Sequence, residues 1–125
     1  MPRMRADEKL IVPGTSVDSN FISGNGAVGQ QSNVALFIKS DKACTFKIQV
    51  SGTSLSAGRN ADVSTNEWFD WHRAADADGV ETITLTAGQA IAVDLSPFAP
   101  QYFRLVCTSM TSGPSTATEA FAVAV

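Results

Sequence analysis

The segment Ser64–Gly79, STNEWFDWHRAADADG, holds the densest set of side chains in the sequence that could do chemistry. It contains His72, the only histidine of the chain, together with two tryptophans and four acids. A histidine beside carboxylates could act as a general base. Clustered acids could bind calcium, and tryptophan rings could stack on a sugar. Each of these functions needs further residues, which the rest of the chain must supply.

The requirements for catalysis and for a calcium site are not met. Any Ser–His–Asp or Cys–His arrangement would have to use His72, and no G-x-S-x-G segment is present to expose a nucleophilic serine. If Gly79 were the sixth residue of a calcium loop, the first and twelfth residues would be Ala74 and Leu85, where acids are needed. We therefore predict that the chain is not an enzyme and has no catalytic residue, no metal site and no cofactor.

The aromatic residues of the segment are expected to point in different directions. In an extended strand, Trp68 and Asp70 face one side, whereas Phe69 and Trp71 face the other. Two tryptophans on opposite faces cannot form one flat platform, which argues against a carbohydrate site. We expect Phe69 and Trp71 to enter the core, and Trp68 to lie on the surface or in a subunit contact.

The two cysteines are too few and too far apart in sequence for a disulfide framework or a metal cluster. In CTFKIQVS, Cys44 shares a strand face with Phe46, and in QYFRLVCTS, Cys107 shares a face with Leu105. Both thiols are therefore predicted to be buried and reduced, acting as small apolar side chains.

From Asn33 onwards the apolar residues recur with the period of a β-strand. The runs are NVALFIKS, CTFKIQVS, ETITLT, AIAVDL, QYFRLVCTS and TEAFAVAV, with Gly, Ser and Pro turns between them. NVALFIKS is apolar in both phases, which suits a strand covered on both faces. TEAFAVAV places Phe121 and Val123 on one side and only alanines on the other. These patterns predict an all-β fold, an antiparallel β-sandwich or jelly-roll-like barrel of about seven or eight strands.

Residues 1–32 have a different composition, with Gly24, Gly26 and Gly29 among Ser, Asn and Gln. Because glycine resists being ordered, we predict an extended Gly/Ser-rich N-terminal arm over residues 1–32 and a β-sandwich domain over residues 33–125. The alternative is a first strand that packs on its own domain.

Composition excludes several classes of partner. A net charge of −3 argues against nucleic-acid binding, which requires a basic surface. The sequence contains no apolar run long enough to span a membrane and no signal peptide, so synthesis in the cytoplasm is expected. Charged residues make up only 17% of the chain, which is consistent with a surface partly covered by another protein.

The C-terminal part carries a resemblance to a known class of proteins. ETITLTAGQAIAVDLSPFAPQYFRLVCTSM followed by TATEAFAVAV resembles small bacteriophage capsid cement or decoration proteins, mainly over residues 80–125. The resemblance implies a structural virion protein on the phage head surface, made in the host cytoplasm. It would bind the major capsid protein and copies of itself as a dimer or trimer, with no nucleic acid, membrane or small-molecule substrate.

Arginines and exposed apolar residues are the expected contacts with such partners. The candidates in the arm are Arg3, Arg5, Leu10, Ile11, Val12, Phe21 and Ile22, and those in the domain are Trp68 and Arg104. Two alternative functions remain: a carbohydrate-binding or receptor-binding module that stacks ligands on Trp68 and Tyr102, and another phage structural part such as a tail or head-completion protein.

Overall fold

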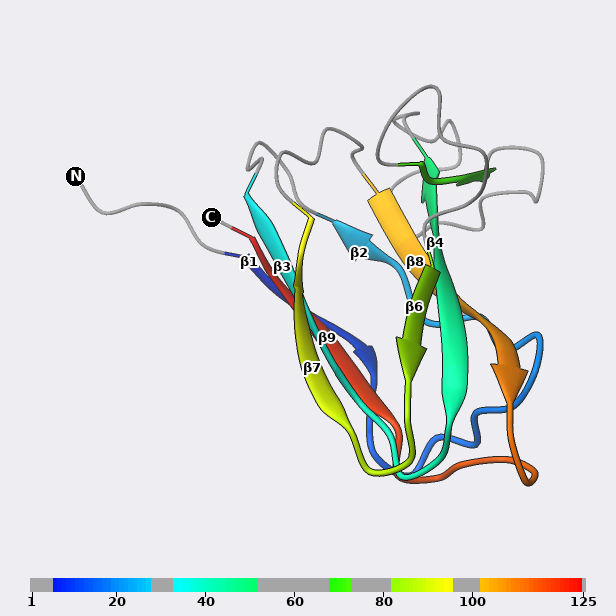
Figure 1. Ribbon diagram of the computed structural model, residues 1–125. Helices are drawn as coiled ribbons and strands as arrows, with labels where there is room; N and C mark the ends of the chain where they lie inside the picture. The colour runs from blue at the N-terminus through cyan, green and yellow to red at the C-terminus, as the bar shows by residue number, and fades with distance from the viewer. Residues whose placement is uncertain (1–5, 28–32, 52–67, 73–81, 96–101, 125) are drawn as a thin grey trace.

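The computed structural model describes residues 6–27, 33–51, 68–72, 82–95 and 102–124, which form two antiparallel β-sheets packed face to face (Figure 1). The strands are β1 (Ala6–Ile11), β2 (Gly26–Ala27), β3 (Val34–Lys39), β4 (Cys44–Ser51), β5 (Phe69–Asp70), β6 (Thr82–Leu85), β7 (Ala90–Asp94), β8 (Tyr102–Met110) and β9 (Glu119–Ala124). The first sheet has the order β1-β9-β3-β7. The second has the order β2-β8-β4-β5, and β6 also pairs with β4. The predicted all-β sandwich is confirmed.

The strand pairing is that of a jelly roll. Apart from the two-residue β5, the first strand pairs with the last (β1 with β9), the second with the second-last (β2 with β8), and then β3 with β7 and β4 with β6. This is the pattern of one long antiparallel ribbon folded over into two sheets. Pairing of β3 with β9 and of β4 with β8 then joins these strand pairs into the two sheets.

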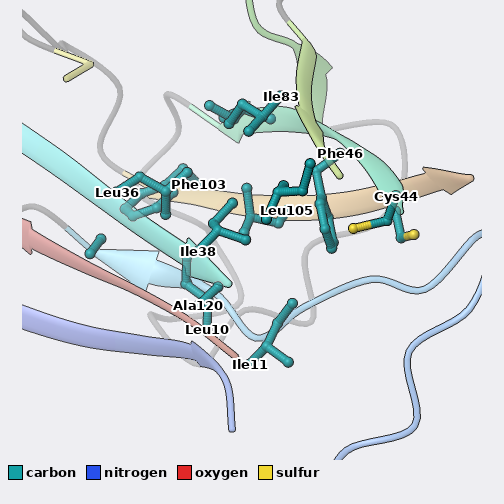
Figure 2. Packing of buried hydrophobic residues seen from close by; sticks show 14 of the residues in the cluster. Leu10, Ile11, Leu36, Ile38, Cys44, Phe46, Ile83, Phe103, Leu105 and Ala120 are labelled. Carbon is teal, nitrogen blue, oxygen red and sulfur yellow. The ribbon is translucent and has the colours of Figure 1, made fainter. Parts of the chain in front are cut away.

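Alternation along the longer strands builds the core, because successive side chains of a strand point to opposite faces. Leu36 and Ile38 of β3 lie in one buried cluster with Phe46 of β4 and with Phe103 and Leu105 of β8 (Figure 2). The inward phases predicted for β4 and β8 are therefore confirmed.

The predicted arm is wrong for the residues that the structure describes. Strand β1 pairs with β9 at the edge of the first sheet, and Leu10 and Ile11 are buried in the core. The register shifts between Lys9, opposite Phe121, and Ile11, opposite Ala120. This bulge inserts one residue and allows two consecutive side chains to point inward. The alternative of a first strand packed on its own domain is the correct one.

The segment that joins β1 to β2 is also tied to the sandwich. Val17 and Ser115 exchange two backbone hydrogen bonds of 2.8 Å, and the amide of Ser23 donates to the carbonyl of Leu105 at 2.9 Å. An isolated bridge between Ile22 and Val106 continues the pairing of β2 along β8. Residues 6–27 therefore belong to the β-sandwich domain. Residues 1–5 and 28–32 lie outside the described residues.

Gly26 marks a close approach between β2 and the core. A Cβ atom at this position would lie 2.6 Å from two ring atoms of the fully buried Phe103, whereas a Cβ at Gly24 would meet only the Leu10 carbonyl at 3.7 Å. We expect Gly26→Ala to lower the free energy of unfolding by about 1–3 kcal/mol, because a packed ring must shift. Gly24→Ala is the matched control and should be close to neutral. Chemical denaturation of both variants tests this, and equal stability would contradict the close approach.

Hydroxyl groups link two turns at the end of the sandwich where β3 leads into β4 and β8 into β9 (bottom of Figure 1). Ser40 Oγ and Thr118 Oγ1 lie 3.0 Å apart, Thr118 Oγ1 donates to Ser115 Oγ at 2.8 Å, and Ser115 Oγ donates to Asp41. Ser40, Ser115 and Thr118 are buried, so these bonds satisfy groups that would otherwise be costly to bury. Sequence patterns did not predict this cluster, because its members come from distant turns.

Both thiols are free and buried, as predicted. Burial is the main cause that raises the pKa of Cys44, and it raises the pKa of Cys107 to about 11. The Sγ of Cys107 donates to the carbonyl of Ser109 at 3.3 Å. The thiolate is the reactive form of cysteine, and a raised pKa keeps both of these thiols protonated. The two cysteines therefore act as core side chains.

Candidate protein-binding surfaces

The middle of the outer face of the first sheet is apolar, and the charged residues Lys9, Lys39, Asp94 and Glu119 lie around it on the same side. In β9 the alanines point into the core, while Phe121 points outward and is 37% exposed. Its ring stacks on that of Phe37 of β3, with centroids 5.0 Å apart and planes inclined by 14°. The register places Ala35, Ala90, Ala92 and Val123 on the same side of the sheet. We call these six residues, Ala35, Phe37, Ala90, Ala92, Phe121 and Val123, the apolar face.

An ion pair borders the apolar face. Lys39 Nζ lies 3.2 Å from Glu119 Oε2, and the two residues are directly opposite each other on β3 and β9. A hollow of about 330 Å³ is lined by this pair, by both phenylalanines, and by β7 residues that include Ala92. It arises because the alanines of β7 are small beside the phenylalanine rings.

The outer face of the second sheet carries a polar network around Arg104. Arg104 of β8 donates from Nε and Nη2 to Gln49 Oε1 of β4, at 2.9 and 2.7 Å. Gln49 Nε2 donates in turn to Asp70 Oδ1 of β5 at 3.1 Å, and Lys47 Nζ lies 3.1 Å from the same oxygen. Burial lowers the pKa of the Arg104 guanidinium, which nonetheless stays protonated.

These contacts hold Asp70 in its charged form. Partial burial alone would raise its pKa, but hydrogen bonds from Gln49 and Lys47, with the charges of Lys47 and His72, bring the pKa below the usual value. A carboxylate with a lowered pKa stabilises the fold above its ordinary pKa, and this contribution is lost as the pH falls.

The prediction that Trp68 lies on the surface is wrong. Trp68 is only 7% exposed, and the Arg104 guanidinium lies over its ring, with Cζ 4.3 Å from the centroid. Trp68 and Arg104, the two partner contacts predicted in the domain, thus lie together, and the Arg104 guanidinium covers the Trp68 ring. Among the described residues, none accepts a hydrogen bond from the buried Trp68 Nε1.

The next aromatic residues are also redistributed. Phe69, predicted to enter the core, is 62% exposed, whereas Trp71 packs partly buried against the core, as predicted. The two rings proposed to stack on a sugar, those of Trp68 and Tyr102, are both buried. This removes the stacking surface on which the carbohydrate-binding alternative depended.

The candidates near the N-terminus divide into two groups. Leu10 and Ile11 are core residues, so their predicted role as partner contacts is wrong, and Phe21 packs partly buried against the core. Val12 and Ile22 are 48% and 47% exposed and remain available to a partner. Arg3 and Arg5 lie outside the described residues.

Within the described ranges, no group of three or more His, Cys, Asp or Glu residues is placed to hold a metal ion. His72 is exposed, and among the described side chains the acid that it influences is Asp70. The described residues also contain no helix with the length and apolar character needed to cross a membrane.

Comparison with known proteins is informative about the fold. No protein-family model matches the chain, and no curated protein matches it. Among solved structures, it is similar to the crystal structure of the SPBc2 prophage-derived protein YomS, with a TM-score of 0.51 and 10% sequence identity. The match covers 99% of this chain and 96% of that chain. At this identity the likeness establishes a common fold over the length of both chains.

Proposed function

We propose that this protein is a structural component of a bacteriophage particle, a cement or decoration protein that binds major capsid subunits on the head surface. It is made in the host cytoplasm and acts by packing against other proteins, without enzymatic turnover or a cofactor. The resemblance of residues 80–125 to cement proteins supports this function, as does the fold shared with a prophage-derived protein.

The observation that carries the proposal is the presence of exposed apolar residues on both outer faces of one sandwich. Phe121 lies at the centre of the apolar face on the first sheet. Ile22 lies on the opposite side, bridged to the outward-facing Val106 of the second sheet. A protein that cements others together needs two separate contact surfaces, and a contiguous apolar face such as that around Phe121 marks a protein interaction site.

Ile22 and Val106 form a partly exposed surface that we call the Ile22 surface. Its backbone is held to β8 by hydrogen bonds. The amide of Cys107 donates to the carbonyl of Phe21 at 2.8 Å, and Asn20 donates to the carbonyl of Cys107 at 2.7 Å. Binding through a segment that is already ordered avoids much of the entropy loss that a flexible arm would suffer. We therefore assign the contact with the shell to the surface around Ile22 and Val106.

Co-sedimentation with purified phage shells tests this assignment. We expect the wild-type protein to sediment with shells and Ile22→Asp to bind roughly tenfold more weakly, because an exposed aliphatic side chain is replaced by a charge. Ser16→Asp adds the same charge at another exposed position of the segment and should bind normally. Wild-type protein that stays in the supernatant would contradict the function, and normal binding by Ile22→Asp would contradict the surface.

A further inference from the structure

We propose that the apolar face is covered by a second copy of this chain, in a two-fold symmetric dimer. This inference rests on the proposed function, because it names the partner of one of the two contact surfaces. It assigns the apolar face to self-association and leaves the Ile22 surface to the shell.

The distribution of side chains on β9 favours a second protein surface over its outer face. Its core side carries Ala120, Ala122 and Ala124, whereas its outer side carries the larger Phe121 and Val123. A strand with one face in water normally places its large apolar residues inside and polar residues outside. Here the greater apolar area lies on the side that the described part of the chain leaves open.

Strand β3 leads to the same conclusion. Its sequence is apolar in both phases, which is typical of a strand covered on both sides. Leu36 and Ile38 fill the core, but Ala35 and Phe37 point to the outer face of a central strand. None of the described residues supplies this second cover, and we assign it to another molecule.

Of the charges around the apolar face, which also include Lys9 and Asp94, the pair Lys39 and Glu119 is self-complementary and points to a second copy as that molecule. Lys39 and Glu119 stand opposite each other on the neighbouring strands β3 and β9. A two-fold axis parallel to the strands and between them would place β9 of each copy over β3 of the other. Lys39 of each copy then meets Glu119 of the second copy, which makes a ring of four alternating charges. An isologous interface needs this self-complementarity.

The same axis also matches the shapes of the two surfaces. It places the second copy's Phe121 over Phe37 and beside the hollow above Ala92 of β7. Two stacked phenylalanine pairs then meet at the centre, where aromatic side chains contribute most to an interface. The two sheets would pack as sandwich sheets do, about 10 Å apart.

The first experiment measures mass in solution by sedimentation velocity, at concentrations up to about 100 µM, because dimer formation follows mass action. We expect a dimer for the wild-type chain and a folded monomer for Phe121→Asp. Ile22→Asp, on the opposite outer face, is the matched control and should remain a dimer. A monomeric wild type, a trimer, or a dimeric Phe121→Asp would overturn the proposal.

A charge exchange tests the symmetry directly. Lys39→Glu and Glu119→Lys each place like charges together within one chain and across the dimer, so each should dissociate at least about tenfold more readily than wild type. A mixture of the two variants should form a heterodimer, because each contact between the chains then joins a carboxylate of one variant to an ammonium group of the other. Recovery in the mixture can only arise between chains, since each chain keeps its internal repulsion. Failure of the mixture to recover would overturn the proposed axis.

The outcomes separate this inference from the proposed function. A monomer that still sediments with shells would overturn self-association and leave the cement function standing, and the apolar face would then belong to a capsid subunit. A dimer that does not sediment with shells would overturn the cement function and leave self-association standing. If Phe121→Asp failed to fold, the mixed charge variants would still decide, because they change only surface residues.

Discussion

Replacing Leu10 with alanine is expected to lower the free energy of unfolding by about 2–5 kcal/mol, the usual range for removing a buried leucine side chain. Leu10 lies in the core cluster beside Ile11, although both belong to a segment with the composition of an arm. The loss combines the apolar area no longer removed from water with the cavity that remains. Equilibrium denaturation followed by circular dichroism measures it.

Val12→Ala is the matched control for this prediction. Val12 lies two residues further on and is about half exposed, so the change should alter stability by no more than about 0.5 kcal/mol.

Deletion of residues 1–11 should prevent cooperative folding, because it removes β1 from the sheet and uncovers the edge of β9. A truncated chain that melts like the wild type would show that these residues form an arm after all.

Trp68→Ala should also destabilise the monomer, by about 3–5 kcal/mol, because the buried indole ring leaves a large cavity. It also removes the contact between the Trp68 ring and the Arg104 guanidinium, a cation–π interaction of about 0.5–2 kcal/mol. Association should change only to the extent that the fold is lost. Chemical denaturation followed by far-UV circular dichroism measures the effect without relying on tryptophan emission.

Two neighbouring changes sharpen this test. Trp68→Phe keeps an aromatic face under Arg104 and removes the buried indole N–H, so it should lose much less stability than Trp68→Ala. Phe69→Ala changes the adjacent, exposed ring and should be nearly neutral. If Trp68→Ala kept full stability but lost dimer or shell binding, Trp68 would be an interface residue.

The local alternation of apolar and polar residues was sufficient to predict most of the strands. Strand β4 alternates over Cys44–Ile48 and β8 over Phe103–Cys107, so the inward phase of Phe46 or Leu105 follows from a period of two alone. The turn at Gly88, which has a positive φ of 78°, follows from its Ala-Gly-Gln sequence. The burial of Cys44 and Cys107 could be predicted for the same reason, since each shares a face with large apolar residues.

Long-range pairing decided what pattern could not predict. Strand β1 does not alternate at its end, because the bulge turns both Leu10 and Ile11 inward, and only its partner β9 at the other end of the chain makes the bulge possible. The Trp68 ring is covered by Arg104, which comes from a distant strand and is hydrogen-bonded to Gln49. Neither cause is visible in the residues that surround either site.

The sequence by itself determined that this protein is a β-sandwich with an alternating core and that β3 and β9 are apolar in both phases. Which phase of these strands faces inward was decided only by the tertiary structure. The core beside β9 is occupied by Leu10 and Ile11 of β1, and small side chains such as Ala120 and Ala122 fit there. Phe121 is therefore directed outward onto Phe37, and the apolar face exists because the core has no room for a larger side chain at that position.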